Sequence, residues 1–192
     1  MNTVIEGKED MVRSVLMAAL ISKEVGRGKK VFTNLTNLTF NGWIEFDFTK
    51  MVEESSPTEF CTDLVNCSVF LNDAFTLFDS RRSSSKLNRI FSYLSAQSRS
   101  RAIDWYFGVP NIDLLDKRIR RSGGLYLVVS ESYSEGTKSK ITISNLGDKT
   151  KILSRSIFNI SKYDNLINDF DLLNIPTEDS IPLSLREVLG IK

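Results

Sequence analysis

The 192-residue sequence contains no histidine. Without an imidazole, the chain cannot use a Ser-His-Asp triad, a Cys-His pair or a His-ligated zinc ion. It has only two cysteines, Cys61 and Cys67, which are too few to hold a tetrahedral metal ion alone, so we expect no metal site. Any chemistry must therefore come from carboxylates, Lys, Arg, hydroxyl groups or the backbone.

Long apolar runs and an export signal are also missing. No stretch of 18 consecutive apolar residues occurs, and charged residues between Glu6 and Arg13 interrupt the amino terminus. A membrane-spanning helix needs about 20 apolar residues, and a signal peptide needs an unbroken apolar centre. The 41% hydrophobic content is enough for one folded core. We therefore predict an intracellular, soluble protein that makes no membrane contact and is not secreted.

The formal net charge of +1 conceals a separation of charge along the chain. Residues 1–80 hold 7 basic and 12 acidic side chains, whereas residues 81–121 hold 10 basic and 3 acidic ones. Such a basic segment can meet a phosphate backbone, because each neutralised phosphate releases counterions. The alternative is a solvated surface that the acidic first third balances. Composition alone leaves both interpretations open.

Apolar runs with strand character alternate with stretches of helical period, which predicts an α/β fold. The expected core is one domain over 1–158 with a mostly parallel sheet, helices on both faces and a carboxyl-terminal hairpin. A tail over 159–192 is expected to pack on it. Expected strands lie at 3–6, 30–34, 43–48, 67–71, 102–109, 125–130, 140–145 and 151–158, and expected helices at 10–25, 57–64, 84–98, 112–120 and 183–189.

The first expected strand and helix enclose a pattern with the spacing of a phosphate-binding loop. Residues 7–14 read Gly-Lys-Glu-Asp-Met-Val-Arg-Ser, where the motif is G-x-x-x-x-G-K-[ST]. Gly7 and Ser14 match the motif, but Val12 replaces its second glycine and Arg13 replaces its lysine. Val12 disfavours the loop conformation, and the two acidic residues of the loop repel phosphate. Arginine does not reproduce the compact ammonium group of lysine.

A second pair of candidate residues follows the buried strand Cys67–Leu71. In phosphoryl-transfer enzymes of this kind, an acid after such a strand holds Mg²⁺ and a polar group orients the attacking water. Here Asn72 and Asp73 occupy these positions. Asn72 lacks the charge that favours a metal ion, and Asp73 is one methylene shorter than the glutamate expected as base.

Two stretches are the most distinctive in the chain. Residues 79–89 read Asp-Ser-Arg-Arg-Ser-Ser-Ser-Lys-Leu-Asn-Arg, and residues 96–104 read Ala-Gln-Ser-Arg-Ser-Arg-Ala-Ile-Asp. Together with Asp-Lys-Arg-Ile-Arg at 116–120 and Ser-Lys-Tyr-Asp-Asn at 161–165, they resemble the HerA/FtsK-type P-loop ATPases. The likeness is strongest to the DNA-packaging or DNA-translocating ATPases of archaeal viruses and mobile elements. It spans residues 3–168 in the family's order and implies a RecA-like P-loop NTPase fold.

The resemblance also implies partners and site residues. It implies sequence-independent binding of DNA, a homo-oligomer or an assembly with an active ATPase, and a place in the host cytoplasm or the virion. Arg118 and Arg120 would serve a neighbouring subunit's active site. Gly108-Val109-Pro110 stands where the family places a polar sensor. The residues expected to contact DNA are Arg81, Arg82, Lys86, Arg89, Arg99 and Arg101.

Loss at the loop, metal and sensor positions together leads to the hypothesis of a pseudo-ATPase, because turnover needs all of these groups at once. Its degenerate phosphate and Mg²⁺ positions are Gly7, Lys8, Arg13, Ser14 and Asn72. One alternative is an active but divergent ATPase that uses ATP and Mg²⁺, with Lys8 as the phosphate-binding cation and Asp73 as ligand or base. Another is a scaffolding protein in which Arg118 and Arg120 are interface cations.

Overall fold

The computed structural model describes residues 1–47, 64–82, 86–130, 132–134 and 136–168, and it contains an eight-stranded sheet in the order β3-β2-β4-β5-β1-β6-β7-β8. The six strands from β3 to β6 are mutually parallel, and β7 and β8 form an antiparallel hairpin against β6. The predicted α/β class and mostly parallel sheet are confirmed. The strands are Asn2–Gly7 (β1), Lys30–Thr33 (β2), Trp43–Glu45 (β3), Cys67–Leu71 (β4), Ile103–Val109 (β5), Gly124–Val129 (β6), Lys138–Asn145 (β7) and Ile152–Asn159 (β8).

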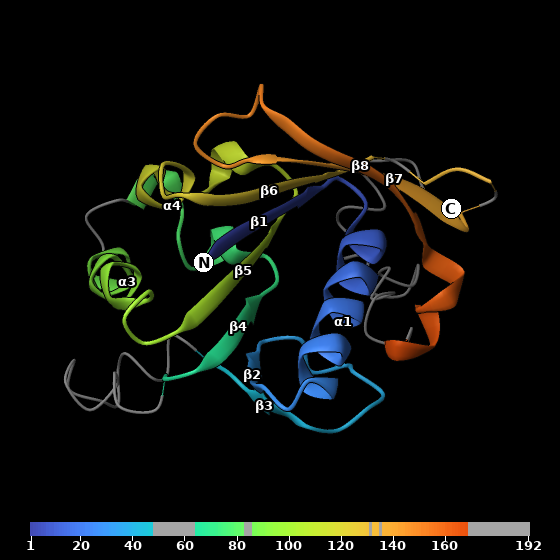
Figure 1. The fold of residues 1–192 in the computed structure, drawn as a ribbon, viewed down its shortest axis with the longest axis horizontal. Helices are drawn as coiled ribbons and strands as arrows, with labels where there is room; N and C mark the ends of the chain where they lie inside the picture. Colours follow the sequence, from blue (N-terminus) through green and yellow to red (C-terminus); the bar gives the residue numbers. More distant parts are fainter. Residues whose placement is uncertain (48–63, 83–85, 131, 135, 169–192) are drawn as a thin grey trace, which may run out of the picture.

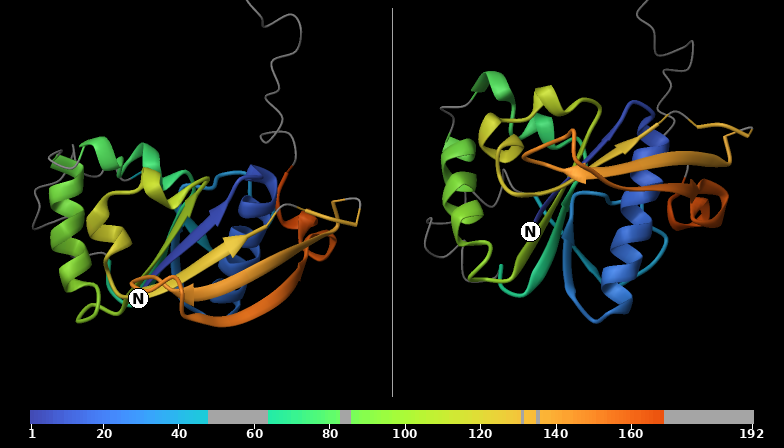
Figure 2. Two further views of the ribbon diagram at one scale, coloured as in Figure 1. Left: turned by 90° about the horizontal axis from the view of Figure 1, so that it is seen from above. Right: turned by 45° about the horizontal axis from the view of Figure 1, so that its top comes forward.

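Helices cover both faces of the sheet, as the sequence predicts (Figures 1 and 2). The long helix α1 (Asp10–Gly26) lies on one face, and α3 (Lys86–Gln97) and α4 (Lys117–Arg120) lie on the other. Val4 and Ile5 are successive residues of β1 and belong to different core clusters, since neighbouring side chains of a strand point to opposite faces. Both are fully buried, so β1 is the centre of the fold.

Strand β1 also marks the point where the chain changes direction across the sheet. From β1 the chain passes through α1 to β2 on one side, and from β5 it passes through α4 to β6 on the other. In open α/β sheets, ligands bind at the carboxyl ends of the strands beside such a switch point. The carboxyl end of β1 is therefore the place to look for a site.

Several elements differ from the sequence prediction. The strand expected at 43–48 is only Trp43–Glu45 among the described residues. The helix expected at 112–120 is broken into the 3-10 turn Ile112–Leu114 and α4, because Leu115 is extended and Asp116 starts a new helix as its N-cap. The helices expected at 57–64 and 183–189 lie almost wholly or wholly outside the described residues.

The chain after β8 continues as two 3-10 turns, Ile160–Lys162 and Asp164–Leu166. Ile160 and Ile167 are buried in the core cluster on the α1 face. The part of the tail up to residue 168 is therefore part of the packed core.

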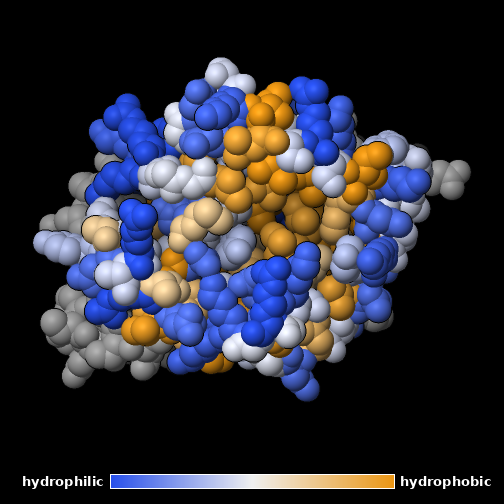
Figure 3. Space-filling model, in the orientation of Figure 1, coloured by the Kyte–Doolittle hydropathy of each residue, from blue (hydrophilic) through white to orange (hydrophobic). Residues whose placement is uncertain are grey.

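In the face shown in Figure 3, apolar side chains gather around a hollow that polar side chains surround.

Among the described helices, none is both long and apolar enough to cross a membrane.

Candidate functional site

The connection between β1 and α1 is too short to form a phosphate loop. Strand β1 ends at Gly7 and α1 begins at Asp10, so only Lys8 and Glu9 lie between them. A phosphate loop needs non-helical backbone up to its lysine, because the N–H groups must curl around the phosphates. Here the backbone N–H of Arg13 donates to the carbonyl oxygen of Glu9 at 3.2 Å, as in a helix. The first turn of α1 has replaced the loop.

A second contact holds this short connection in place. The Glu9 carboxylate accepts hydrogen bonds from the backbone N–H and the hydroxyl group of Ser132, each at 2.7 Å. Ser132 follows β6, the neighbour of β1 in the sheet. The connection is thereby tied to the next strand, which opposes its opening into a wider loop.

Arg13 lies at the position of the motif lysine and is buried, with 2% of its surface exposed. Its Nη1 donates to the carbonyl oxygen of Gly7 at 2.7 Å, and its Nη2 donates to Oδ1 of Asp73 at 2.7 Å. Its Nε donates to Oδ1 of Asn72 at 3.2 Å, and Nη2 also pairs with Asp10, three residues earlier in α1. One guanidinium group therefore bonds the residues of both expected nucleotide motifs to each other.

Asn72 extends this network to two further residues. Its Nδ2 donates to the hydroxyl oxygen of Ser14 at 3.4 Å. Its backbone N–H donates to Oδ1 of Asn34 at 2.7 Å, and its carbonyl oxygen accepts from Nδ2 of Asn34 at 2.8 Å. Asn34 follows β2, which pairs with β4, so the carboxyl ends of three strands are joined by side chains. The hydroxyl expected to face Mg²⁺ is engaged by an amide instead.

Asp73 has an uncommon backbone conformation, and the pKa of its carboxyl is raised. Its φ of 49° and ψ of 41° place it in the left-handed region, where a non-glycine residue is uncommon. Burial raises the pKa of its carboxyl above the usual value, and Asp10 raises it further, while Arg13 acts in the opposite direction. The carboxylate that would act as base is thus partly desolvated and bound to an arginine of its own chain.

Gly108 makes room for this network from the neighbouring strand β5. A Cβ atom at Gly108 would lie 2.6 Å from Sδ of Met17, 2.8 Å from Oδ1 of Asn72 and 3.4 Å from Cδ of Arg13. Any side chain at this position would displace one of these groups. The position where a polar sensor was expected therefore serves to accommodate Arg13 and Asn72.

The groups at this position do not fit ATP and Mg²⁺. The guanidinium group of Arg13 occupies the position of the motif lysine, and the amide of Asn72 occupies the position where Mg²⁺ needs a carboxylate. The carboxylate of Asp73 is bound to Arg13. Within the described parts of the chain, no group of three or more potential Cys or acidic ligands could hold a metal ion. We therefore assign no chemical step to a nucleotide here.

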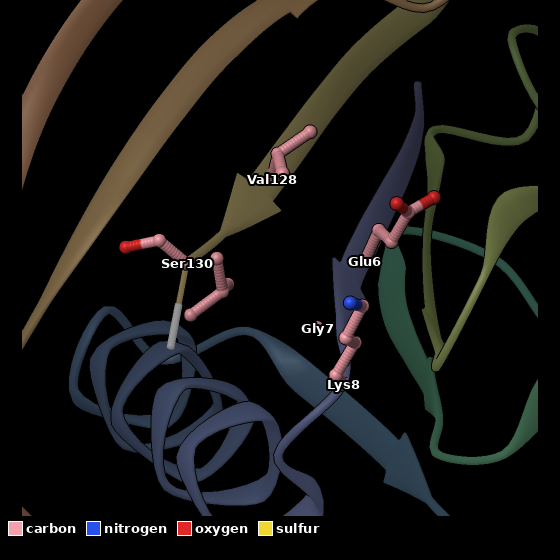
Figure 4. A pocket seen from close by; sticks show the side chains of 6 residues that line it. Glu6, Gly7, Lys8, Val128 and Ser130 are labelled. Atoms are coloured by element: carbon pink, nitrogen blue, oxygen red, sulfur yellow. The ribbon is translucent and has the colours of Figure 1, made fainter. Parts of the chain in front are cut away.

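A pocket of about 400 Å³ lies beside this network, at the carboxyl ends of β1 and β6. Glu6, Gly7, Lys8 and Ser130 are among its lining residues (Figure 4). Lys8 is exposed there, whereas the Glu6 carboxylate points away from Ser130 and accepts hydrogen bonds from the backbone N–H of Ile112 and the hydroxyl of Tyr126. Lys8 and Arg13, both expected near phosphate, therefore lie in different surroundings, one solvated and one buried.

Among the residues expected to contact DNA, the three with described side chains lie at the two ends of α3. Arg81 lies before α3 and pairs with Asp79, whereas Arg99 and Arg101 follow the other end of this helix. The 12 residues of α3 span about 18 Å, which separates the two groups. Arg101 donates to the side chain of Gln97 at 3.0 Å. The backbone places Arg82 in a 3-10 turn and both Lys86 and Arg89 in α3, while their side chains lie outside the described atoms.

Arg118 and Arg120, expected to serve a neighbouring subunit, are paired within their own chain. Nε of Arg118 donates to Oδ1 of the buried Asp116 at 2.9 Å, and its Nη1 donates to the hydroxyl of Ser92 in α3 at 3.0 Å. Nη1 of Arg120 lies 3.1 Å from Oδ1 of Asp113. Arg118 fastens α4 to α3 in this structure.

Three residues of the network were not identified from the sequence. Asp10 could have been found, because it lies three residues before Arg13 on one helix and such pairs face each other. Asn34 is harder to identify from the sequence. It follows β2, and only the strand order shows that β2 lies beside β4. The steric role of Gly108 has no signal in the sequence alone.

Known proteins resemble this chain in fold and not in sequence. No protein-family model matches the chain, and no curated protein matches it in sequence. Among solved structures, the N-terminal domain of zonular occludens toxin from Neisseria meningitidis is similar, with a TM-score of 0.61 and 17% identity over 87% of this chain and 98% of that one. The fold is P-loop NTPase-like.

Two further structures support this assignment. The DNA-packaging ATPase B204 from Sulfolobus turreted icosahedral virus has a TM-score of 0.58 and 10% identity, over 82% of this chain and 96% of that one. The genome packaging NTPase B204 from Sulfolobus turreted icosahedral virus 2, in complex with ATP-gammaS, has a TM-score of 0.54 and 8% identity, over 83% and 96%. The likeness covers 82% to 87% of this chain and 96% to 98% of the other chains.

Proposed function

We propose that this chain is a pseudo-ATPase related to DNA-packaging and DNA-translocating ATPases, and that it handles DNA for a virus or mobile element without hydrolysing ATP. The bonding of Arg13 to Gly7, Asn72 and Asp73 carries the proposal. These contacts link the two motifs internally, at the place where Mg²⁺ and a bound nucleotide would otherwise join them. A buried arginine with these partners costs free energy to displace, because each broken contact leaves a polar group unpaired.

The DNA part of the proposal rests on different support. The chain resembles packaging and translocating ATPases in residues 79–89 and 96–104, and its fold is similar to that of a viral DNA-packaging ATPase. Basic residues are also concentrated outside the acidic first 80 residues. A protein of this class would bind the phosphate backbone and would not need to read base sequence.

The nucleotide part is tested by calorimetric titration with ATP and Mg²⁺ and by a radiolabelled hydrolysis assay in the presence of duplex DNA. We expect no saturable heat and no hydrolysis above the rate of the Asp73→Ala variant. Mg²⁺-dependent hydrolysis that Asp73→Ala abolishes would overturn the proposal. If Lys8→Ala also abolished that hydrolysis, the divergent active ATPase would be the correct function.

The DNA part is tested by fluorescence anisotropy with a labelled 30-base-pair duplex of arbitrary sequence. Affinity should fall steeply between 50 and 200 mM salt and should change little when the sequence is scrambled. Absence of binding at 50 mM salt would remove the DNA role while leaving the nucleotide part untouched.

A second candidate function, assembly without DNA, is favoured by one observation. Strand β8 is the last strand of the sheet in the described structure, and its Ile152, Leu153 and Ile157 side chains are exposed. Exposed edge strands with apolar side chains can pair with another chain. Light scattering after size-exclusion chromatography would favour this function if it showed a stable oligomer that Ile157→Ser dissociates and that DNA does not affect.

A further inference from the structure

The β7–β8 hairpin carries a charge opposite to that of the rest of the molecule. Residues 138–159 contain five basic side chains and one acidic side chain. The rest of the chain contains more acidic than basic side chains, 23 against 20. A compact region with excess positive charge on an otherwise acidic protein attracts polyanions locally. The basic character that the sequence suggested for 81–121 is therefore not the only concentration of positive charge.

Three cations of residues 81–121 are held in ion pairs within the chain. Arg81, Arg118 and Arg120 each form an ion pair with an aspartate of the chain. Among the described residues, no ion pair involves a basic residue of the hairpin. A cation that already faces a carboxylate must give up that contact to bind a phosphate, whereas a solvated cation releases only counterions. The hairpin cations can therefore bind phosphate without giving up an ion pair. In the part of the chain that the structure describes, only Lys149 among them contacts an aromatic ring, with its Nζ 5.1 Å from the centroid of Tyr126.

Three of these cations share one face of the hairpin. In the register of the two strands, Lys138 lies opposite Asn159, Lys140 opposite Ile157 and Thr142 opposite Arg155. These positions are two residues apart along β7, so their side chains point to the same side. Ile141 and Ile143, on either side of Thr142 in the strand, point to the α1 face and its core. Lys138, Lys140 and Arg155 are all exposed.

Two of these cations also line a hollow on the hairpin. A pocket of about 580 Å³ is lined by Lys140 and Arg155 together with Ser130, Tyr133, Ser156 and Ile157. Lys140 and Arg155 supply N–H donors to phosphate oxygens, whereas the hydroxyl of Ser130 already donates to the carbonyl oxygen of Lys140 at 3.1 Å. This pocket lies apart from the network around Arg13 and shares only Ser130 with the pocket beside it.

The length of the hairpin suits an extended polyanion. Eight-residue β7 spans about 27 Å, and the face positions of Lys138, Lys140 and Arg155 repeat about every 6.8 Å. B-DNA rises about 3.4 Å per base pair along its axis, so β7 is about as long as eight base pairs of duplex. Lys149 and Lys151 extend the cations to the turn, next to the start of β6, where Leu146 bonds to Gly124. Figure 2 shows the hairpin along one edge of the molecule.

We propose that the β7–β8 hairpin is the surface that binds the phosphate backbone of duplex DNA, through Lys138, Lys140 and Arg155 on its face and Lys149 and Lys151 at its turn. This inference rests on the DNA role proposed above and moves the contact away from residues 81–121. Ile157 lies among the face cations and contributes an apolar contact to the hairpin surface rather than a charge.

The experiment compares two triple variants that each remove three positive charges. One is Lys138→Gln/Lys140→Gln/Arg155→Gln, and its matched control is Arg81→Gln/Arg99→Gln/Arg101→Gln. Anisotropy of the labelled 30-base-pair duplex is measured from 50 to 200 mM salt. We expect the hairpin variant to lose at least tenfold in affinity and about three units of salt slope, and the control to change affinity less than threefold. All variants are first compared with wild type by circular dichroism.

The outcomes distinguish failure of this inference alone from failure of the DNA role on which it rests. If wild type binds DNA and the control variant loses affinity while the hairpin variant does not, the inference is wrong and the DNA role stands. If wild type binds no duplex at 50 mM salt, both fail. If wild type binds vesicles with 30% phosphatidylserine but not the duplex, the hairpin serves an anionic membrane surface and the inference is also overturned.

Discussion

Nη2 of Arg13 donates to Oδ1 of Asp73 at 2.7 Å, and the two residues lie 60 positions apart in the chain. One comes from the position of a phosphate-binding lysine and the other from the position of a catalytic acid. In this molecule, each residue is a hydrogen-bond partner of the other. The pair cross-links the start of α1 to the chain that follows β4.

The first prediction concerns this cross-link. Arg13→Met should lower the free energy of unfolding by about 2 to 3 kcal/mol, because it removes the donor shared by Gly7, Asn72 and Asp73. Urea denaturation followed by circular dichroism measures it. Lys8→Met, which removes a solvated charge from the adjacent position of the motif, should change stability by less than about 0.5 kcal/mol. Equal effects of the two variants would show that the network around Arg13 adds no stability.

The second prediction concerns the space that Gly108 provides. Gly108→Ala should destabilise the protein by about 1 to 3 kcal/mol, because the added methyl group overlaps Met17 and Asn72. Gly123→Ala is the matched control, since a Cβ there meets nothing within 4 Å, and it should leave stability unchanged or raise it by less than about 1 kcal/mol. Thermal melts of both variants test the difference. A Gly108→Ala protein as stable as wild type would mean that the network rearranges without cost.

The third prediction concerns pH and Asp116. Burial alone raises the pKa of the Asp116 carboxyl, but hydrogen bonds from the side chain and backbone of Arg118 outweigh it and hold the pKa below its usual value. An acid with a lowered pKa in the folded state stabilises that state above its unfolded pKa of about 3.9 and loses this contribution as pH falls through the folded value. Asp116→Asn should therefore be less stable than wild type at pH 7, and the difference should shrink below pH 4.

Urea midpoints between pH 2.5 and 7 measure this dependence. Asp164→Asn provides the comparison, because Asp164 is exposed and its Oδ1 accepts only a local backbone hydrogen bond from Asn165 among those described. Its stability should follow the wild-type curve. A constant gap between wild type and Asp116→Asn at every pH would contradict the assignment.

The fourth prediction concerns Ser98, part of the distinctive stretch at 96–104. Its hydroxyl oxygen accepts from Nε1 of Trp105 at 2.7 Å and its hydroxyl group donates to the carbonyl oxygen of Leu94 at 2.7 Å. Trp105 is fully buried, so Ser98→Ala leaves an indole N–H unpaired and should cost about 1 to 3 kcal/mol. Ser100→Ala removes an exposed hydroxyl and should cost less than about 0.5 kcal/mol. If the two variants lost the same free energy of unfolding, the hydrogen bond between Ser98 and Trp105 would contribute no stability.

The sequence was sufficient for the class of fold but not for the arrangement at the site. Apolar runs such as Cys67–Leu71 locate the strands, because burial on both faces requires apolar side chains throughout. The break at Leu115 was missed although Asn111 and Asp116 both carry helix-capping side chains. The spacing of apolar residues does not reveal this break, because the 3-10 turn and α4 both bury their apolar side chains in the same core.

The partners of Arg13 depend on long-range geometry. Asn72 and Asp73 follow β4, and β5 separates β4 from β1 in the sheet. Whether an arginine can reach across this intervening strand depends on the absence of a side chain at Gly108. The sequence indicated that a phosphate site was degenerate at these positions. Only the structure shows that the substituted residues bond to one another.

The central place of β1 has a consequence for synthesis on the ribosome. Its two neighbours, β5 and β6, end at Val109 and Val129, whereas β1 ends at Gly7. At about 5 to 20 residues per second, β1 therefore waits roughly 6 to 24 seconds before its second edge can pair. During this interval an apolar strand has an open edge, which exposes the nascent chain to mispairing and to capture by chaperones. The strand made first completes its pairing late.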